Sequence, residues 1–155
     1  YESPVIREAL IGAVGSDVCD IAGRLDRAYL ASYMFGNAER VAMVNRIVHP
    51  VVRADFKEWA QRTGRAIVAV ESAILFEAGM EADVDVVWVV SAPEDVRLQR
   101  AVRRDDSNEE AVRNRMRSQL NELEYLERAD SVVYNDARHS LIQQVSNLLY
   151  EISDK

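Results

Sequence analysis

The stretch that decides the fold is Asp85-Val86-Val87-Trp88-Val89-Val90, followed at once by Ser91-Ala92-Pro93-Glu94. The first run is almost continuously apolar and rich in β-branched residues, which is typical of a strand covered on both faces, as in a parallel sheet. The second run is a helix-start signature, and it predicts a helix from Pro93 to Asp105. A strand that leads directly into a helix is the unit from which parallel α/β sheets are built.

Two further apolar runs, at residues 66–70 and 131–135, predict strands before and after this unit. The spacing of apolar residues predicts the other helices, at residues 4–14, 25–35, 37–48, 51–62, 107–127 and 138–152. We expect His49-Pro50 to end one of these helices and Pro50 to start the next, because proline lacks the backbone N–H that a helix interior needs. The order of these predicted strands and helices along the chain indicates an α/β fold, with a parallel sheet that has helices on both faces. The helices predicted within residues 15–63 have no strand among them, and this predicts a helical subdomain.

Composition narrows the class of protein. The chain has 155 residues, 48% of them hydrophobic, and a net charge of −7, which argues against nucleic-acid binding. No apolar run approaches the roughly 18 residues of a membrane span, and the first residues lack the features of a signal peptide. Cys19 is the single cysteine, and this fits a reducing cytoplasm. We therefore expect a cytoplasmic protein without a membrane partner; the sequence carries no signal for an oligomeric state.

Arginine is concentrated in one region of this acidic chain. Residues 97–117 hold seven arginines against four acidic residues. Arg97, Arg100 and Arg104 share one helical face, and the guanidinium group is suited to phosphate. One hypothesis is that this face and the next helix, with Arg113 and Arg117, enclose a small anion. The alternative is a solvated face whose arginines pair with neighbouring acids such as Glu94, Asp105 and Glu110.

Several polar residues lie where ligands of α/β proteins bind, at the carboxyl ends of strands. Glu71 follows the predicted strand 66–70 and could hold a metal-bound water, or it could cap the next helix. Asn135, at the carboxyl end of the predicted strand 131–135, could contact a base or ribose, or form a turn. Glu77 could orient a ligand or end a short helix. His49 could be a base, although a histidine before proline is often structural.

Taken together, the chain resembles the dephospho-CoA kinase family over nearly its whole length. Val44 to Arg53 resembles the family pattern L-x-x-I-x-H-P-x-(I/V)-R, and Arg97 to Asp105 resembles Q-x-x-R-x-x-x-R-D. The other similar stretches are GRLDRAYL (23–30), ESAILFE (71–77), VDVVWVV (84–90), RSQ (117–119) and ADSVVYN (129–135). Their order and spacing carry the resemblance, because no one of them would suffice.

The resemblance implies transfer of the ATP γ-phosphate, with Mg²⁺, to the ribose 3′-hydroxyl of dephospho-CoA, the final step of coenzyme A synthesis. It implies a P-loop kinase fold with an α/β core (1–14, 64–96 and 129–155), a helical substrate subdomain (15–63) and a lid (97–128). Arg100 and Arg104 would be the catalytic lid arginines. The substrate residues would be His49, Arg53 and Glu77, and the nucleotide residues Asn135 and Glu71.

The chain also departs from the family pattern. Ala73 replaces a proline, and Glu71 replaces the common aspartate. No GxxxxGK[ST] phosphate loop and no early catalytic aspartate occur in the sequence. We therefore expect the chain as printed to be inactive and its parent protein to be active. The alternatives are another small-molecule P-loop kinase, of the nucleoside monophosphate or shikimate type, and a non-catalytic binding domain of the same fold.

Overall fold

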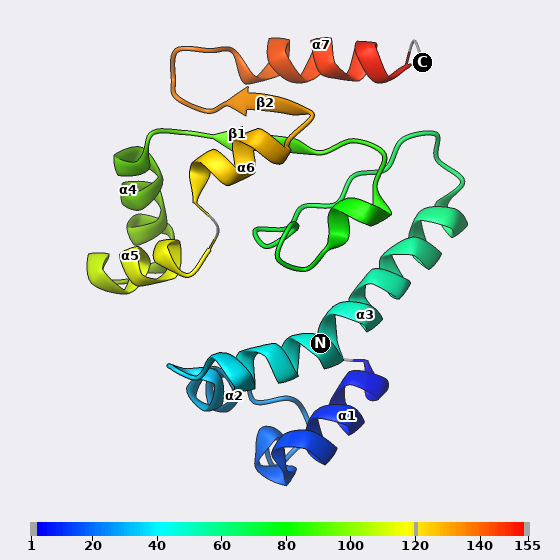
Figure 1. The fold of residues 1–155 in the computed structure, drawn as a ribbon, viewed down its shortest axis with the longest axis vertical. Helices are drawn as coiled ribbons and strands as arrows, with labels where there is room; N and C mark the ends of the chain where they lie inside the picture. The colour runs from blue at the N-terminus through cyan, green and yellow to red at the C-terminus, as the bar shows by residue number, and fades with distance from the viewer. Residues whose placement is uncertain (1–2, 120, 154–155) are drawn as a thin grey trace. The chain divides into compact units, whose positions relative to one another are not determined.

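The computed structural model describes residues 3–119 and 121–153, and these form two compact units (Figure 1). The N-terminal unit ends at Glu71 and the C-terminal unit begins at Ser72. Within the described residues, no helix combines the length and the apolar character that crossing a bilayer requires.

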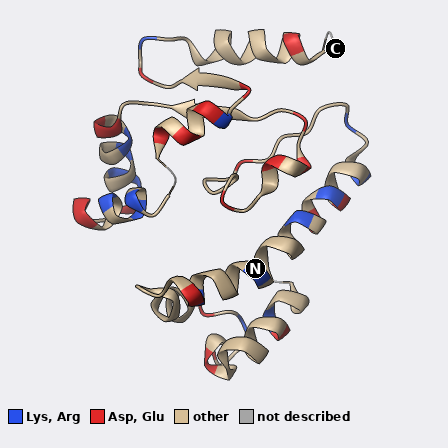
Figure 2. Ribbon diagram, viewed as in Figure 1, with Lys and Arg blue, Asp and Glu red and all other residues tan. Residues whose placement is uncertain are grey.

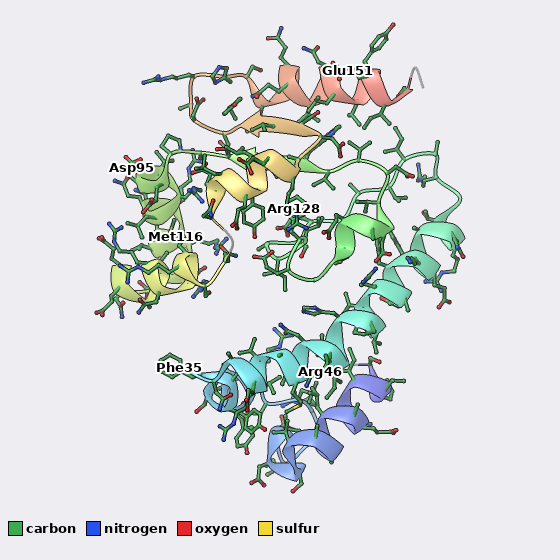
Figure 3. The ribbon with its side chains drawn as sticks, in the orientation of Figure 1. Phe35, Arg46, Asp95, Met116, Arg128 and Glu151 are labelled. Carbon is green, nitrogen blue, oxygen red and sulfur yellow. The ribbon has the colours of Figure 1, made fainter. Side chains whose placement is uncertain are left out.

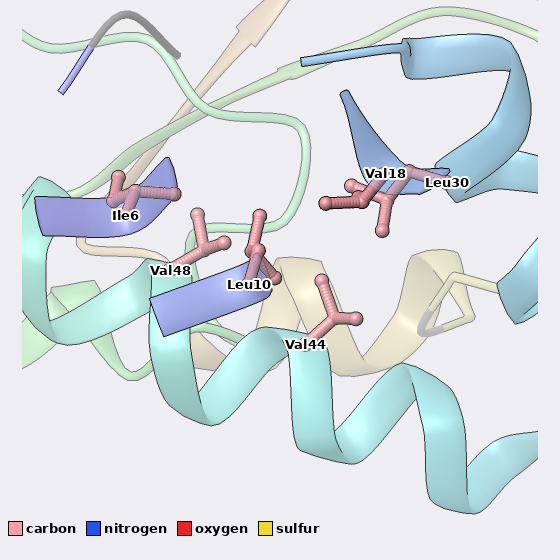
Figure 4. Packing of buried hydrophobic residues seen from close by; sticks show 6 residues of the cluster. All are labelled: Ile6, Leu10, Val18, Leu30, Val44 and Val48. Carbon is pink, nitrogen blue, oxygen red and sulfur yellow. The ribbon is translucent and has the colours of Figure 1, made fainter. Parts of the chain in front are cut away.

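The N-terminal unit is helical and surrounds one apolar core. It contains α1 (Pro4–Val14), the short 3-10 helix η1 (Ser16–Val18), α2 (Arg27–Met34) and α3 (Ala38–Thr63). Side-chain oxygens cap two of the helices: Asp26 accepts from the first backbone amides of α2, and Asn37 accepts from the amide of Arg40 in α3. The core residues come from all four elements, as Figure 4 shows: Ile6, Leu10, Val18, Leu30, Val44 and Val48.

The predicted break at His49-Pro50 is wrong, because α3 runs through Pro50 without interruption. Proline removes one helical hydrogen bond, but the turns before and after it keep theirs. Val44 and Val48, just ahead of Pro50, are buried in the core and hold that half of the helix in place. The helix ends at Gly64, whose φ of 59° is the left-handed conformation that glycine adopts without steric cost.

The C-terminal unit has the predicted α/β architecture. Its strands β1 (Trp88–Ser91) and β2 (Ser131–Tyr134) pair in parallel, with Trp88 opposite Ser131 and Ser91 opposite Tyr134. Its helices are η2 (Met80–Asp83), α4 (Glu94–Asp105), α5 (Glu109–Arg117), α6 (Glu122–Arg128) and α7 (Leu141–Ser153). Helix α7 packs along β2 (Figure 1), and buried Val87, Leu98, Val112 and Val133 lie among these elements.

Two other predicted elements differ from the structure. Residues 66–70 form no strand in the described chain, although the run was predicted as one. β-branched side chains favour extended backbone, but a strand also needs a neighbour with which to form a ladder. The helix predicted at 107–127 is divided into α5 and α6, because the chain leaves the helix at Ser118 and starts again after Asn121. The side chain of Asn121 caps the second helix by accepting from the amide of Glu124.

Candidate functional site

The carboxyl ends of β1 and β2 lie at one edge of the sheet in the C-terminal unit. Because the strands are parallel and in register, Ser91 and Tyr134 are partners at that edge. The backbone amide of Asn135 donates to the carbonyl oxygen of Ser91 at 2.8 Å. This is the edge at which open α/β sheets bind ligands, and the sequence prediction for Asn135 placed it there.

Arg100 reaches this edge from α4. The helix starts directly after β1, and its buried Leu98 anchors it to the unit. The Nη1 atom of Arg100 donates to the carbonyl oxygen of Asn135 at 3.0 Å. The structure therefore brings together two of the predicted site residues and places a positive charge, which is exposed, at the strand ends.

Arg104 lies one turn further along α4, away from these contacts. Its guanidinium pairs with Asp105 at 2.7 Å, and the same carboxylate pairs with Arg115 of α5 at 2.8 Å. Hydrogen bonds from Arg104, then from Arg115, lower the pKa of Asp105 to about 2, and the bond to Asp105 raises the pKa of Arg104.

The arginines of α5 also have polar partners on their own surface. Arg113 pairs with Glu109 at 2.8 Å and lies 3.6 Å from Glu94, and Arg117 donates to the side chain of Asn114. Figure 2 shows both signs of charge mixed on α4 and α5. The ion-paired surface, the alternative drawn from the sequence, therefore describes Arg104 and Arg113, whereas Arg100 contacts Asn135 at the strand ends.

Arg97, on the same face of α4, is held by other parts of the protein. Its Nε donates to the carbonyl oxygen of Ala92 at 2.9 Å, and its Nη2 pairs with Glu122 of α6 at 2.9 Å. Glu122 also accepts from the Ser91 hydroxyl at 2.7 Å. Glu122 was not predicted as a site residue, since it is separated from both partners by more than 20 residues and no local pattern marks it.

Glu77 belongs to a second group of contacts in this unit, centred on Tyr125 of α6. The Tyr125 hydroxyl lies 2.8 Å from Oε1 of Glu77 and 3.0 Å from the carbonyl oxygen of Ala73. Burial, with the neighbouring Glu77 carboxylate, raises the pKa of Tyr125. The centroid of the Phe76 ring lies 5.4 Å from that of Tyr125 and 4.2 Å from the guanidinium of Arg128, a residue labelled in Figure 3. Tyr125 is a second residue that the sequence did not single out.

The loop after β2 is held by one carboxylate. Asp136 accepts hydrogen bonds from the backbone amides of Arg138 and His139 and from the His139 ring at 3.0 Å. These bonds, the amide of Arg138 first, lower the pKa of Asp136 to about 2. Between them Ala137 has a φ of 65°, a left-handed conformation that costs an alanine roughly 1–2 kcal/mol. The bonds of Asp136 hold the loop in this conformation beside Asn135.

The remaining candidates belong to the N-terminal unit. His49 and Arg53 lie one turn apart on α3 and are both half-buried. Burial, and then the positive charge of Arg53, lower the pKa of His49. Glu71 is the last residue of this unit and is exposed. Among residues 3–119 and 121–153, no three His, Cys, Asp or Glu side chains converge as a preformed metal site.

Comparison with known proteins gives one consistent answer. The family model described as dephospho-CoA kinase matches residues 4–140. The dephospho-CoA kinase of Bacteroides fragilis is 40% identical over 147 residues, which cover 94% of this chain and 71% of that protein. The dephospho-CoA kinase of Porphyromonas gingivalis is 40% identical over 99% of this chain and 76% of its own length.

Two solved structures are similar to this chain. The crystal structure of TT1252 from Thermus thermophilus has a TM-score of 0.75 and 30% identity, and the match covers 95% of this chain and 80% of that one. The dephospho-CoA kinase from Campylobacter jejuni has a TM-score of 0.61 and 26% identity, over 96% of this chain and 76% of that one. The family model over residues 4–140 and the 40% identity over 94% of this chain show that the chain belongs to the dephospho-CoA kinase family.

Proposed function

We propose that this protein is a dephospho-CoA kinase, which transfers the γ-phosphate of ATP to the ribose 3′-hydroxyl of dephospho-CoA and so completes coenzyme A. The observation that carries the proposal beyond family membership is the contact between Arg100 and Asn135 at 3.0 Å. It puts a guanidinium at the carboxyl ends of the strands, where α/β kinases hold their nucleotide.

Arg100 has the position and the chemistry of a group that stabilises charge during transfer. Phosphoryl transfer needs positioning and charge neutralisation more than covalent chemistry by the protein. The guanidinium of Arg100 is exposed, and its contact is a backbone carbonyl, a neutral acceptor that an anionic phosphate oxygen outcompetes. Arg104 would assist only after leaving Asp105, so we give it the lesser catalytic role.

The substrate and nucleotide residues follow from the family pattern. His49 and Arg53 would contact or shape the dephospho-CoA site from α3. Glu77, which contacts the Tyr125 hydroxyl, would orient a ligand. Asn135 would lie near the adenine of ATP. We keep the division into core, helical substrate subdomain (15–63) and lid (97–128), a cytoplasmic location, and small molecules as the partners in place of nucleic acid or membrane.

Mg²⁺ would bind together with the triphosphate, since this ion is usually held by one or two carboxylates and the substrate phosphates. Glu71 could supply such a carboxylate, because its side chain is exposed. It would hold a metal-bound water. When bound, the ion supplies neutralisation of the charge on the β- and γ-phosphates.

A substrate panel on the protein encoded by the complete gene tests the assignment. Labelled ATP is offered with dephospho-CoA, with nucleoside monophosphates and with shikimate, and ³¹P NMR locates the new phosphate. We expect transfer to dephospho-CoA at the ribose 3′ position. Transfer to a nucleotide or to shikimate alone would reassign the protein to another P-loop kinase class. Failure to bind ATP would identify a non-catalytic binding domain.

A further inference from the structure

One carboxylate connects three separate elements near the strand ends. Glu122 is the first residue of α6, and its Oε1 accepts from the hydroxyl of Ser91, the last residue of β1, at 2.7 Å. Its Oε2 accepts from Nη2 of Arg97, in the first turns of α4, at 2.9 Å. A single side chain therefore ties the end of β1 to the beginning of the helix that carries Arg100.

These contacts restrict Arg97 more than Arg100. The guanidinium of Arg97 bonds both to Glu122 and to the carbonyl oxygen of buried Ala92. Because the guanidinium is planar and its donors have a rigid geometry, two such acceptors define the orientation of the side chain and of the turn that bears it. Arg100 lies on the next turn of the same face, so this turn also determines where its guanidinium points.

We propose that Glu122 is a positioning residue for phosphoryl transfer, acting through Arg97 to hold Arg100 at the carboxyl ends of β1 and β2. The proposal rests on the proposed function. Arg97 and Glu122 are each 38% exposed, and ion pairs this accessible to water add little to stability. The contribution of the pair is therefore the orientation of α4, and its loss affects turnover more than folding.

Glu122→Gln is the variant that tests this role. The amide keeps the size of the side chain and a hydrogen bond to Ser91 but loses the charge that pairs with Arg97. We expect kcat to fall by about tenfold to a hundredfold, as for small misplacements of a catalytic group, with KM for dephospho-CoA and Tm nearly unchanged. Glu127→Gln, at an exposed site on the same helix, is the matched control and should leave kcat unchanged. Equal kcat values in the two variants would overturn the proposal.

A double-mutant cycle separates positioning from general damage. If Glu122 acts through Arg100, then Arg100→Ala should lower kcat much less in the Glu122→Gln background than in the unmodified protein, because the arginine is already misplaced. Arg97→Gln should show the same coupling. Losses that multiply independently in both cycles would show that Glu122 does not act through Arg100.

A measurement that does not depend on kinase activity can test the position of Arg100 separately from the proposed function. The Arg100 Nε–Hε signal in an NMR spectrum of the free protein should shift in Glu122→Gln and stay in place in Glu127→Gln. If the protein encoded by the complete gene does not phosphorylate dephospho-CoA, the proposed function fails, and this signal decides the positioning claim by itself. An unmoved Arg100 signal in Glu122→Gln would refute that claim even in an active kinase.

Discussion

The two units of this protein are stabilised in different ways. In the N-terminal unit, apolar side chains from four elements meet in one core. In the C-terminal unit, polar side chains also join segments far apart in the chain: Glu122 reaches Ser91 and Arg97, and Tyr125 reaches Ala73. Apolar burial is non-directional and contributes stability, whereas hydrogen bonds depend on angle and distance and so specify orientation. The unit that holds Arg97 and Arg100 therefore contains contacts that specify the orientation of these side chains.

The largest effect on stability should come from the apolar core of the N-terminal unit. Leu10 is fully buried between α1 and α3, and Leu10→Ala should lower the free energy of unfolding by about 2–5 kcal/mol, because it removes buried apolar surface and leaves a cavity. Urea titration measures the loss. The control is Ile11→Ala, an isomeric side chain on the same helix that is 37% exposed, which should cost clearly less. Equal losses would mean that this core is not what stabilises the unit.

The largest effect on activity should come from Arg100. Arg100→Ala removes a charged donor from the strand ends, and we expect kcat to fall by about 10²- to 10³-fold with little change in Tm, since the side chain is exposed. Steady-state kinetics of the complete protein measure it. Arg103→Ala, at an exposed position on the same helix, should retain turnover. Unchanged turnover in Arg100→Ala would remove Arg100 from the mechanism.

Much of the fold could be predicted from local sequence. The start of α1 at Pro4, the strand around Trp88 and the helix after Pro93 follow from signals within a few residues, and the structure confirms them. The failures occurred where distant packing decides. Buried Val44 and Val48 hold the half of α3 that leads into Pro50, and the apolar run at 66–70 needed a ladder partner that propensity cannot supply.

The site was predictable to the extent that it follows from strand ends and helical spacing. Asn135 and Arg100 lie in contact because Asn135 follows β2, and Arg100 is on α4, the helix that follows the neighbouring strand β1. Helical spacing could not show that Arg100 and Arg104 have different contacts. Arg104 pairs with Asp105, which also pairs with Arg115 of the next helix. Glu122 and Tyr125 act on partners more than 20 residues away, so no window of sequence reveals them.

A smaller effect is expected from the second polar contact of the C-terminal unit. Tyr125→Phe keeps the ring beside Phe76 but removes the hydroxyl that bonds to Glu77 and Ala73. We expect the free energy of unfolding to fall by about 0.5–1.5 kcal/mol, the usual net value of such a hydrogen bond, as measured by urea titration. Tyr150→Phe, at a residue 69% exposed on α7, is the control. A loss of the same size in both variants would exclude a structural role for the Tyr125 hydroxyl.

In the loop after β2, the contribution of Asp136 to the stability of the fold should depend on pH. Because the pKa of Asp136 is lowered from 3.8 to about 2, its ionised form stabilises the folded protein above about pH 4, and this contribution is lost as the pH falls through 2. Asp136→Asn should therefore be less stable at neutral pH, and its difference from the unmodified protein should shrink on acidification. Thermal melts between pH 7 and 2 measure this. A difference that is constant over that range would show that the Asp136 charge is not involved.

The smallest effect on stability should come from His49 in the N-terminal unit, where burial of the side chain disfavours its protonated form. Burial, and then Arg53, lower the pKa of His49 below 6.5; the unfolded chain therefore binds a proton that the folded chain does not. Stability is complete above about pH 6.5 and falls as the pH drops from there toward the folded pKa. His49→Gln cannot take up that proton, so its stability should vary less with pH in this range, as thermal melts at pH 7.5 and 5.5 can show. If the pH dependence of stability is the same in His49→Gln and in the unmodified protein, then folding does not lower the pKa of His49.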